Sequence, residues 1–449
     1  MKFTKFGKAL LMSALTAGVI FVVSSCIQTY SVGYLYVTTT VTAQPSGEGL
    51  ITGYKIEHNT GGLTKINGLP ISTGGANPIR AVLTQASRFV YVLNRGANSA
   101  GNGNCTTANP CLSPNITLFA VGGNGILTPQ QTYYTQGNNP FRIAVDSSGS
   151  YLMVLDHDAP SSAGCQAALG SGVTSCGDIT VFQINGTTGR LSLVQNQQVL
   201  IAGVPLTYFP VPANPVDFLL TASNVLTLTS STAQTSFPYT GGSQVFPYTY
   251  NGSTGQLTLS LSTPQSLGIA QGNAIVNGSG TVYVLDNEPI TYTSSGTTTT
   301  AASQILPFTV GTNGSLQAQT GGIVPDDPTM ANPTQLLVES KGKFVYLANQ
   351  GNNTTGNNPN SGIAAYLLNT SPSYQLTFIP GEPFGSGSGP QCIVEDPSDQ
   401  YVFTANQYDS TVTGRVLDPN SGVLNNMRVS SSYVLPGPAS WCFIDGRTN

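Results

Sequence analysis

The side chains best suited to chemistry in this chain are a histidine flanked by aspartates and two arginines near strand starts. His157 lies between Asp156 and Asp158, and the chain has only two histidines. A carboxylate beside an imidazole can orient and charge it, so that the imidazole acts as a general base. Arg80 and Arg142 can each clamp a carboxylate or phosphate bidentately. We therefore consider His157 as a base, Asp156 as its orienting group and the two arginines as an anion site.

The same side chains also have a structural interpretation, and the sequence leaves both open. Arg80 and Arg142 can pair with Asp146, Asp217 or carboxylates at strand ends. Asparagine and aspartate at the end of a strand satisfy backbone groups through Asx turns. That role alone accounts for five strand-end residues, Asn94, Asp156, Asp286, Asn349 and Asn406.

Other motifs that carry chemistry are weak or absent. The second histidine, His58, lies in a turn, where we expect it to be solvated. Asp326-Asp327 and the acidic residues around His157 lack the spacing of an EF-hand, so we expect no metal site. The sequence has no Gly-rich phosphate loop, no Gly-x-Ser-x-Gly elbow and no His-Glu-x-x-His motif. We expect no cofactor.

A repeated sequence pattern predicts the strands that position these residues. An Asn-Pro or Gly-Pro opens a short apolar strand, a turn follows, and an aromatic-aliphatic strand ends in Asn or Asp, as in residues 77–94 and 139–156. One such unit cannot bury its own apolar face and must stack on its neighbours. The unit averages 60 residues, because the opening residues span 360 positions in six steps, at Pro78, Pro140, Pro215, Gly272, Pro333, Pro390 and Pro438.

Each unit continues with a third strand, a Gly-containing turn and a fourth strand, as in residues 179–193 and 245–259. Alternating apolar residues, β-branched and aromatic enrichment and Asn-Gly turns are typical of antiparallel hairpins. We find no convincing amphipathic helix after residue 25. Four strands per unit and seven units predict an all-β fold, a seven-bladed β-propeller of four-stranded antiparallel blades.

The two ends of the repeat region are complementary half-units. Residues 33–37 form a second strand that lacks a first, and residues 437–444 form a first strand that lacks a second. Together they would complete one blade and close the ring, which removes open sheet edges. A tandem of separate β-sandwiches is the alternative, but it does not explain such half-units.

In a four-stranded blade, strand one begins at the end of the ring where strand two finishes, so both line one mouth of the central channel. Long loops between strands two and three lie at the same end, and such loops mark the binding face of a repeat protein. The candidate ligand-binding residues at this mouth are Arg80, Arg142, Asn94, Asp286, Gln335 and Asn349.

The Tyr-Val-x-Asn strand endings and the repeat length resemble the seven-bladed lactonase-type propellers, which include bacterial 6-phosphogluconolactonase-like proteins and YVTN-repeat propellers. The resemblance covers Gly33 to about Gly446. It implies hydrolysis of a sugar lactone. Enzymes of this type generally carry an acidic residue or histidine on an inner strand beside their arginine. The first strand at 271–276 has no titratable group, and this departure weighs against catalysis.

The N-terminus predicts export. A basic start precedes an apolar run of about 15 residues, which is too short to span a bilayer and is typical of a signal segment. The run ends in Val-Ser-Ser before Cys26, which resembles the bacterial lipobox, and this resemblance implies a lipidated cysteine. We predict a signal peptide at 1–25, a tether at 26–32 and one propeller domain at 33–449. An ordinary cleaved signal with a chance cysteine is the alternative.

The remaining six cysteines suit a compartment that permits disulfides. Two pairs are local, within single loops, and the last two cysteines lie on corresponding strands of successive repeats. The predicted pairs are Cys105–Cys111, Cys165–Cys176 and Cys392–Cys442. No Cys-x-x-Cys spacing supports a metal site.

The composition agrees with export and argues against one class of partner. Charged residues make up 8 % of the chain, against roughly 25 % in ordinary soluble domains. The net charge of −4 and the lack of a basic patch argue against nucleic acid. We expect a monomer, lipid-anchored in a bacterial cell envelope and either periplasmic or surface-exposed. It would bind a small-molecule or protein ligand at its loop-rich mouth; the alternative is a lactonase-type hydrolase.

Overall fold

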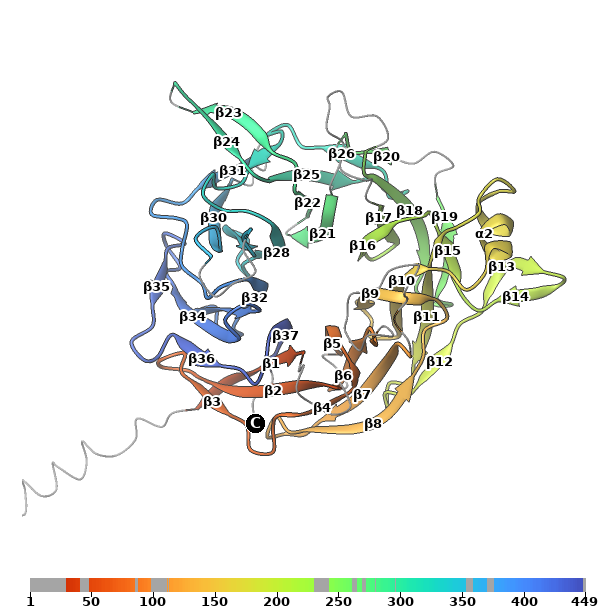
Figure 1. Cartoon of the computed structure of the whole chain (residues 1–449), viewed down its shortest axis with the longest axis horizontal. Coiled ribbons are helices and arrows are strands. Elements are labelled where there is room, and N and C mark those ends of the chain that lie inside the picture. Colours follow the sequence, from red (N-terminus) through yellow and green to blue (C-terminus); the bar gives the residue numbers. More distant parts are fainter. Residues whose placement is uncertain are drawn as a thin grey trace, which may run out of the picture.

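Seven antiparallel sheets surround a central axis in the computed structural model (Figure 1). The structure describes residues 30–40, 48–84, 88–97, 111, 113–229, 242–260, 265–268, 272–278, 280–294, 296–352, 358–369 and 375–446. Each sheet has the same strand order from the axis outward, and neighbouring strands are antiparallel. The predicted seven-bladed propeller is confirmed.

The two inner strands of every blade correspond to the two strands of the repeated sequence pattern. The innermost strands are β5 (Pro78–Thr84), β9 (Asn138–Val145), β16 (Pro215–Leu220), β21 (Gly272–Gly278), β28 (Pro333–Val338), β32 (Pro390–Glu395) and β37 (Ala439–Asp445). The second strands are β6 (Phe89–Asn94), β10 (Tyr151–Asp158), β17 (Asn224–Thr229), β22 (Thr281–Asp286), β29 (Phe344–Asn349), β33 (Tyr401–Asn406) and β1 (Ser31–Thr39).

The outer strands complete the blades, and the outermost position is often filled in two pieces. The third strands are β7 (Asn115–Val121), β11 (Gly177–Ile184), β18 (Gln244–Asn251), β25 (Gln304–Val310), β30 (Gly362–Asn369), β34 (Thr411–Leu417) and β2 (Glu48–Glu57). The fourth strands are β8 (Leu127–Tyr133), β12 (Leu191–Leu193), β19 (Gln256–Leu259), β26 (Leu316–Ala318), β31 (Gln375–Phe378), β35 (Leu424–Asn426) and β3 (Leu63–Lys65). In five blades a further short strand pairs with the other end of the third strand: β4 (Ile71–Ala76), β15 (Phe209–Val211), β20 (Gln265–Ser266), β27 (Val324–Pro325) and β36 (Ser432–Val434).

The core is divided between the blades. Every residue of β6, β17, β22, β29 and β33 is buried, because each second strand packs against a neighbouring blade on both faces. This explains why these strands are nearly continuous apolar runs. The buried apolar residues form seven clusters, one at each interface between adjacent blades.

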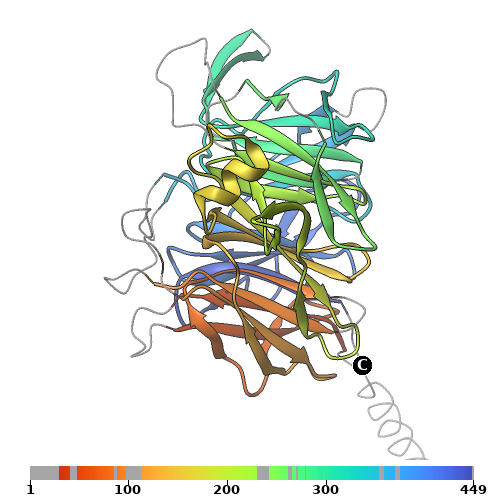
Figure 2. The ribbon, with the colours of Figure 1, turned by 90° about the vertical axis from the view of Figure 1, so that its right-hand side faces the viewer.

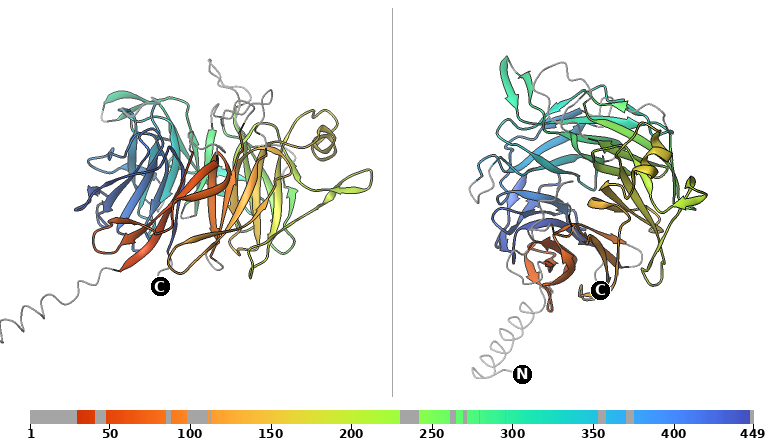
Figure 3. Two further views of the ribbon diagram at one scale, coloured as in Figure 1. Left: turned by 60° about the horizontal axis from the view of Figure 1, so that its bottom comes forward. Right: turned by 45° about the vertical axis from the view of Figure 1, so that its right-hand side comes forward.

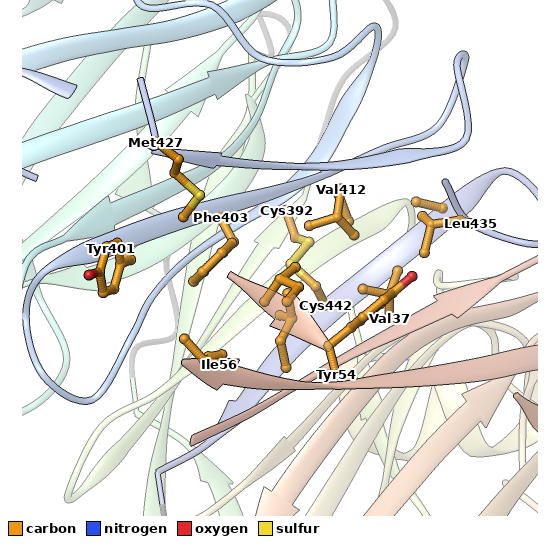
Figure 4. Packing of buried hydrophobic residues seen from close by; sticks show 14 residues of the cluster. Val37, Tyr54, Ile56, Cys392, Tyr401, Phe403, Val412, Met427, Leu435 and Cys442 are labelled. Atoms are coloured by element: carbon orange, nitrogen blue, oxygen red, sulfur yellow. A yellow bond between two sulfur atoms is a disulfide. The ribbon is translucent and has the colours of Figure 1, made fainter. Parts of the chain in front are cut away.

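The ring is closed by the two ends of the chain, as predicted. β1 pairs with β37 along its length, with Tyr34 opposite Asp445 and Thr38 opposite Trp441. A disulfide joins Cys392 of β32 to Cys442 of β37, with 5.8 Å between the Cα atoms. Figure 4 shows this bond inside the cluster that packs the last blade against the closing blade. We call this blade interface the seam.

The outer side of the ring carries elements that the sequence did not predict. Helix α2 (Ser162–Leu169) contradicts the expectation of no helix, and Figure 2 shows it on the outside of the ring. It spans only eight residues, too few to reveal a period in the sequence, and is held by an N-cap at Ser161 and by the Cys165–Cys176 disulfide. Two hairpins also project outward (Figure 1), formed by β13 (Asn196–Ile201) with β14 (Val204–Leu206) and β23 (Ile290–Ser294) with β24 (Thr297–Ala301).

The two ends of the described chain lie on the same face of the ring. β1 starts at Ser31 and runs toward the mouth, whereas its partner β37 starts at the mouth and ends at Asp445. The left view of Figure 3 shows the first strands of the chain, in red, beside the last strands, in blue. Among the described residues, no helix is long and apolar enough to cross a membrane.

Candidate functional site

The mouth where first strands begin and second strands end contains a cavity of about 750 Å³. Six of the seven blades contribute to its lining. The lining side chains include three guanidinium groups, several carboxamides and two large aromatic rings. No carboxylate or imidazole is among the described residues that line it.

At this mouth, a repeated backbone irregularity changes the direction of the side chains at the start of each first strand. The residue before the opening proline has a positive φ, between 51° and 74°, at Asn77, Asn139, Asn214, Asn332 and Gly389. Asparagine and glycine tolerate this left-handed conformation best, which explains the Asn-Pro and Gly-Pro openings. Directly after the opening, each first strand has a register shift of the β-bulge kind. Such a bulge redirects a side chain and ends regular pairing.

Arg80 is the most unusual residue of the cavity. Its guanidinium lies 3.5 Å from the centroid of the Trp441 ring, in a cation–π contact across two blades. Among the described residues Arg80 forms no ion pair with a carboxylate. Burial, and then the nearby Arg142, hold the pKa of Arg80 well below its usual value. This cation is therefore stacked and partly desolvated, but not neutralised.

Arg142 is the second guanidinium of the inner layer, and it is partnered. Its Nε donates to Oδ1 of Asp217 at 2.9 Å. The other oxygen of Asp217 accepts the backbone N–H of Ile275 at 3.0 Å. The buried Asp217 carboxylate thus fixes Arg142 and links three consecutive blades. The pairing of Arg142 with Asp217, which the structural interpretation foresaw, is present, whereas Arg80 remains free of such a partner.

The third guanidinium, Arg95, shares an aromatic neighbour with His157. Arg95 lies 4.7 Å from the centroid of the Phe141 ring, and the His157 ring packs edge-on against the same Phe141 at 5.6 Å. His157 itself does not line the cavity. Its Nδ1 lies 2.8 Å from Oδ1 of Asp158, so its carboxylate partner is Asp158.

Asp156, the predicted orienting group, is fully buried in its blade. It lies directly opposite Asp178 in the pairing of β10 with β11. Thr180 donates from Oγ1 to both carboxyl groups, at 3.4 and 3.3 Å. Burial raises the pKa of Asp156 to about 8. Burial, together with the charge of Asp156, raises the pKa of Asp178 well above its usual value.

The other predicted ligand residues also face into the blades. Asn94 donates to Asn115 at 2.8 Å, and Asp286 accepts from Gln304 at 2.6 Å. Asn349 is fully buried, and Gln335 accepts the backbone N–H of Ile393 in the next blade at 3.1 Å. None of the four lines the cavity. Asn94, Asp286 and Asn349 are fully buried at the ends of their second strands, and their side chains bond to other side chains of the fold instead of facing the cavity.

The predicted local disulfide Cys165–Cys176 and the seam disulfide Cys392–Cys442 are both present. Cys105, Cys26 and the predicted signal segment lie outside the described residues. The Cys105–Cys111 pairing and the lipidation of Cys26 therefore stay predictions.

The closed ring of four-stranded blades defines the chain as a β-propeller with a cavity at one mouth that is lined in part by guanidinium groups. The family model "Lactonase, 7-bladed beta-propeller" matches residues 48–163 and 301–440, more than half of the chain. The chain therefore belongs to the seven-bladed lactonase propeller family.

Solved structures agree on the fold. A putative 6-phosphogluconolactonase from Bacteroides fragilis superposes with a TM-score of 0.61 and 14% identity, covering 92% of this chain and 98% of that one. The periplasmic gluconolactonase PpgL from Pseudomonas aeruginosa gives a TM-score of 0.61 and 16% identity, covering 92% and 99%. A search of curated proteins found no match.

Proposed function

We propose that the protein is a lactonase-type hydrolase that opens the lactone of an acidic sugar derivative at the channel mouth. The observation that carries this proposal is Arg80, a stacked guanidinium that forms no ion pair within the described chain and lies beside Arg142. An anionic ligand would neutralise it and relieve the repulsion between the two cations. Membership of the lactonase family, and the neighbours named as gluconolactonases, make a sugar lactone the fitting ligand class.

Two guanidiniums in one cavity suit lactone hydrolysis. When water attacks the lactone carbonyl, negative charge develops on the carbonyl oxygen, and fixed N–H donors stabilise it. One of the pair Arg80 and Arg142 would hold the acidic group of the substrate, and the other would donate to this oxygen. The described lining holds no imidazole or carboxylate, so a second solvent water would take the proton of the attacking water. The ring C–O bond then breaks, and the ring oxygen takes a proton from water and becomes a hydroxyl group of the open acid.

His157 as a base remains a separate prediction. Its ring contacts Phe141, which lines the cavity, but His157 itself does not line it. Replacing His157 with Ala should leave lactone hydrolysis unchanged if the arginines act alone. Loss of hydrolysis in a folded variant would instead restore the histidine to the mechanism.

A ligand-binding module without turnover is the second candidate. It is favoured by the same absence of a side-chain base from the described lining. On this view the mouth would bind the open sugar acid, or an acidic group on a partner, and release it unchanged. The two candidates share the anion site and differ only in catalysis.

The experiment measures hydrolysis of glucono-δ-lactone and 6-phosphogluconolactone, together with calorimetric binding of gluconate and 6-phosphogluconate. We expect turnover above the spontaneous rate, reduced at least tenfold by Arg80→Gln and by Arg142→Gln. The matched control is Arg190→Gln, because Arg190 is exposed and does not line the cavity. Binding without turnover would select the second candidate, and neither binding nor turnover would refute both.

We also propose that the protein is exported and anchored through a lipid on Cys26. The disulfides at 165–176 and 392–442 support an oxidising compartment. Because β1 starts on the face opposite the mouth, such an anchor would leave the mouth turned away from the membrane. Radiolabelled fatty acid should enter the wild-type protein and not Cys26→Ala; equal labelling of both would refute the anchor.

A further inference from the structure

The cavity is chemically divided, and its second half is built from carboxamides. The cationic and aromatic side chains come from the closing blade and the two blades that follow it. The other wall carries six amide side chains, from the blades that contain β21, β28 and β32: Asn273, Asn287, Asn332, Gln350, Gln391 and Gln407. This wall has no charged group among its described residues.

Three of these amides form a fixed unit, which we call the glutamine triad: Gln350, Gln391 and Gln407. Gln350 follows β29, Gln391 lies in β32, and Gln407 follows β33. The side-chain oxygen of Gln407 accepts from Nε2 of Gln350 at 2.9 Å and from Nε2 of Gln391 at 3.1 Å. Gln407 is thus the hub that holds two neighbouring amides in place.

This arrangement leaves polar atoms of both kinds for a ligand. The oxygen of Gln407 is occupied twice, and within the described chain no hydrogen bond is formed by its NH₂ group or by the side-chain oxygens of Gln350 and Gln391, so these atoms are available at the cavity. If the oxygen and nitrogen of all three amide groups were exchanged, the network would persist. Gln407 would then present an acceptor oxygen, and Gln350 and Gln391 would each present an NH₂ donor. In either arrangement the triad offers donors and acceptors side by side.

A mixed and neutral set of this kind fits hydroxyl groups. A hydroxyl donates one hydrogen bond and accepts others, so vicinal hydroxyls match alternating amide donors and acceptors. A cation or an anion would need a net charge, which this wall lacks. Asn273 extends the same wall, where it donates to Asn287 at 3.2 Å and to the carbonyl of Pro333 at 2.6 Å.

We propose that the glutamine triad forms hydrogen bonds with the hydroxyl groups of a polyhydroxylated ligand, while Arg80 and Arg142 bind the acidic end of that ligand. The triad then determines specificity for sugar acids and their lactones over simple acids of the same charge. This inference rests on the proposed function, because it assumes that the acidic group binds at the arginines.

The test compares gluconate with hexanoate, which has the same carboxylate and carbon number but no hydroxyls, by calorimetry. We expect the wild-type protein to bind gluconate at least tenfold more tightly than hexanoate. Gln407→Met keeps the side-chain length and removes the amide, and should weaken gluconate binding about tenfold without changing hexanoate binding. Gln350→Met should act in the same direction. Gln317→Met is the matched control, because Gln317 is exposed and distant from the cavity lining.

The outcomes separate the two proposals. Equal affinity of the wild-type protein for gluconate and hexanoate would overturn the triad inference and leave the anion site intact. Unchanged gluconate affinity in both glutamine variants would overturn it as well. Failure of the wild-type protein to bind either acid would instead refute the proposed function. Circular dichroism melting of each variant establishes that it is folded.

Discussion

Removing the seam disulfide should weaken ligand binding at the mouth as well as lower the stability of the fold. The variant is Cys392→Ala with Cys442→Ala, which breaks the only covalent link between β37 and the rest of the ring beyond the backbone itself, among the described residues. β37 is the last strand of the chain, and it carries Trp441 one residue before Cys442. The perturbation therefore acts on ring closure and on the partner of Arg80 together.

The expected loss of stability follows from loop entropy. The seam disulfide closes a loop with a sequence separation of 50, for which the chain-entropy estimate is about 4 kcal/mol. The Cys165–Cys176 disulfide has a separation of 11, which gives about 3 kcal/mol. Removing the second disulfide is thus a matched control, of similar energetic effect but on the outer side of the ring.

The assay uses Trp441, the single tryptophan of the chain. Guanidinium unfolding is followed by tryptophan fluorescence, which reports the seam, and by circular dichroism, which reports all blades. In the seam variant we expect the fluorescence transition to come first, and gluconate affinity to fall about tenfold. In the control variant both probes should move together and affinity should be unchanged. Coincident transitions and normal affinity in the seam variant would refute this reasoning.

Four further predictions concern charge. Arg80→Lys keeps the charge but loses the planar stack and the paired donors, so gluconate affinity should fall about tenfold in calorimetry. Raising NaCl from 0.05 to about 0.5 M should weaken gluconate binding, because salt screens the attraction to the guanidiniums. Burial raises the pKa values of Asp156 and Asp178, so the folded state keeps protons that the unfolded chain releases between about pH 4 and 8, and stability should fall as pH rises through this window. Asp178→Asn, which imitates the hydrogen-bonded Asn94–Asn115 pair, should stabilise the protein at pH 7.5 by on the order of 2 kcal/mol in urea unfolding.

The fold was largely predictable because one repeated sequence pattern specifies each blade. The opening Asn or Gly is needed for a left-handed residue, which recurs in five units, and the apolar second strand is needed for burial on both faces. Ring closure followed from the two half-units. Helix α2 was missed because its eight residues are stabilised by a cap and a disulfide, which leave no periodic pattern.

The site was only partly predictable, because side-chain direction depends on the bulges. Arg80 and Arg142 were found from their place after the opening proline. Trp441 occupies the same position, opposite Thr38 as Arg80 is opposite Leu93, but it lies one residue further from its proline.

Strand-end residues were misjudged for a related reason. Asn94, Asp286 and Asn349 end their strands at the mouth, but their side chains are buried and bond to other side chains of the fold. The residues that reach the cavity are the next ones along the chain, such as Arg95, Asn287 and Gln350. A shift of one residue in a strand turns a side chain to the other face, and pattern alone does not resolve it at a strand end.

A crystal structure of the protein with bound 6-phosphogluconate tests the central claim most directly. We predict the ligand in the mouth cavity, with an anionic group within hydrogen-bond distance of Arg80 and Arg142 and hydroxyls against Gln407. A ligand bound elsewhere on the ring, with Arg80 still stacked on Trp441 and touching no anion, would contradict the account.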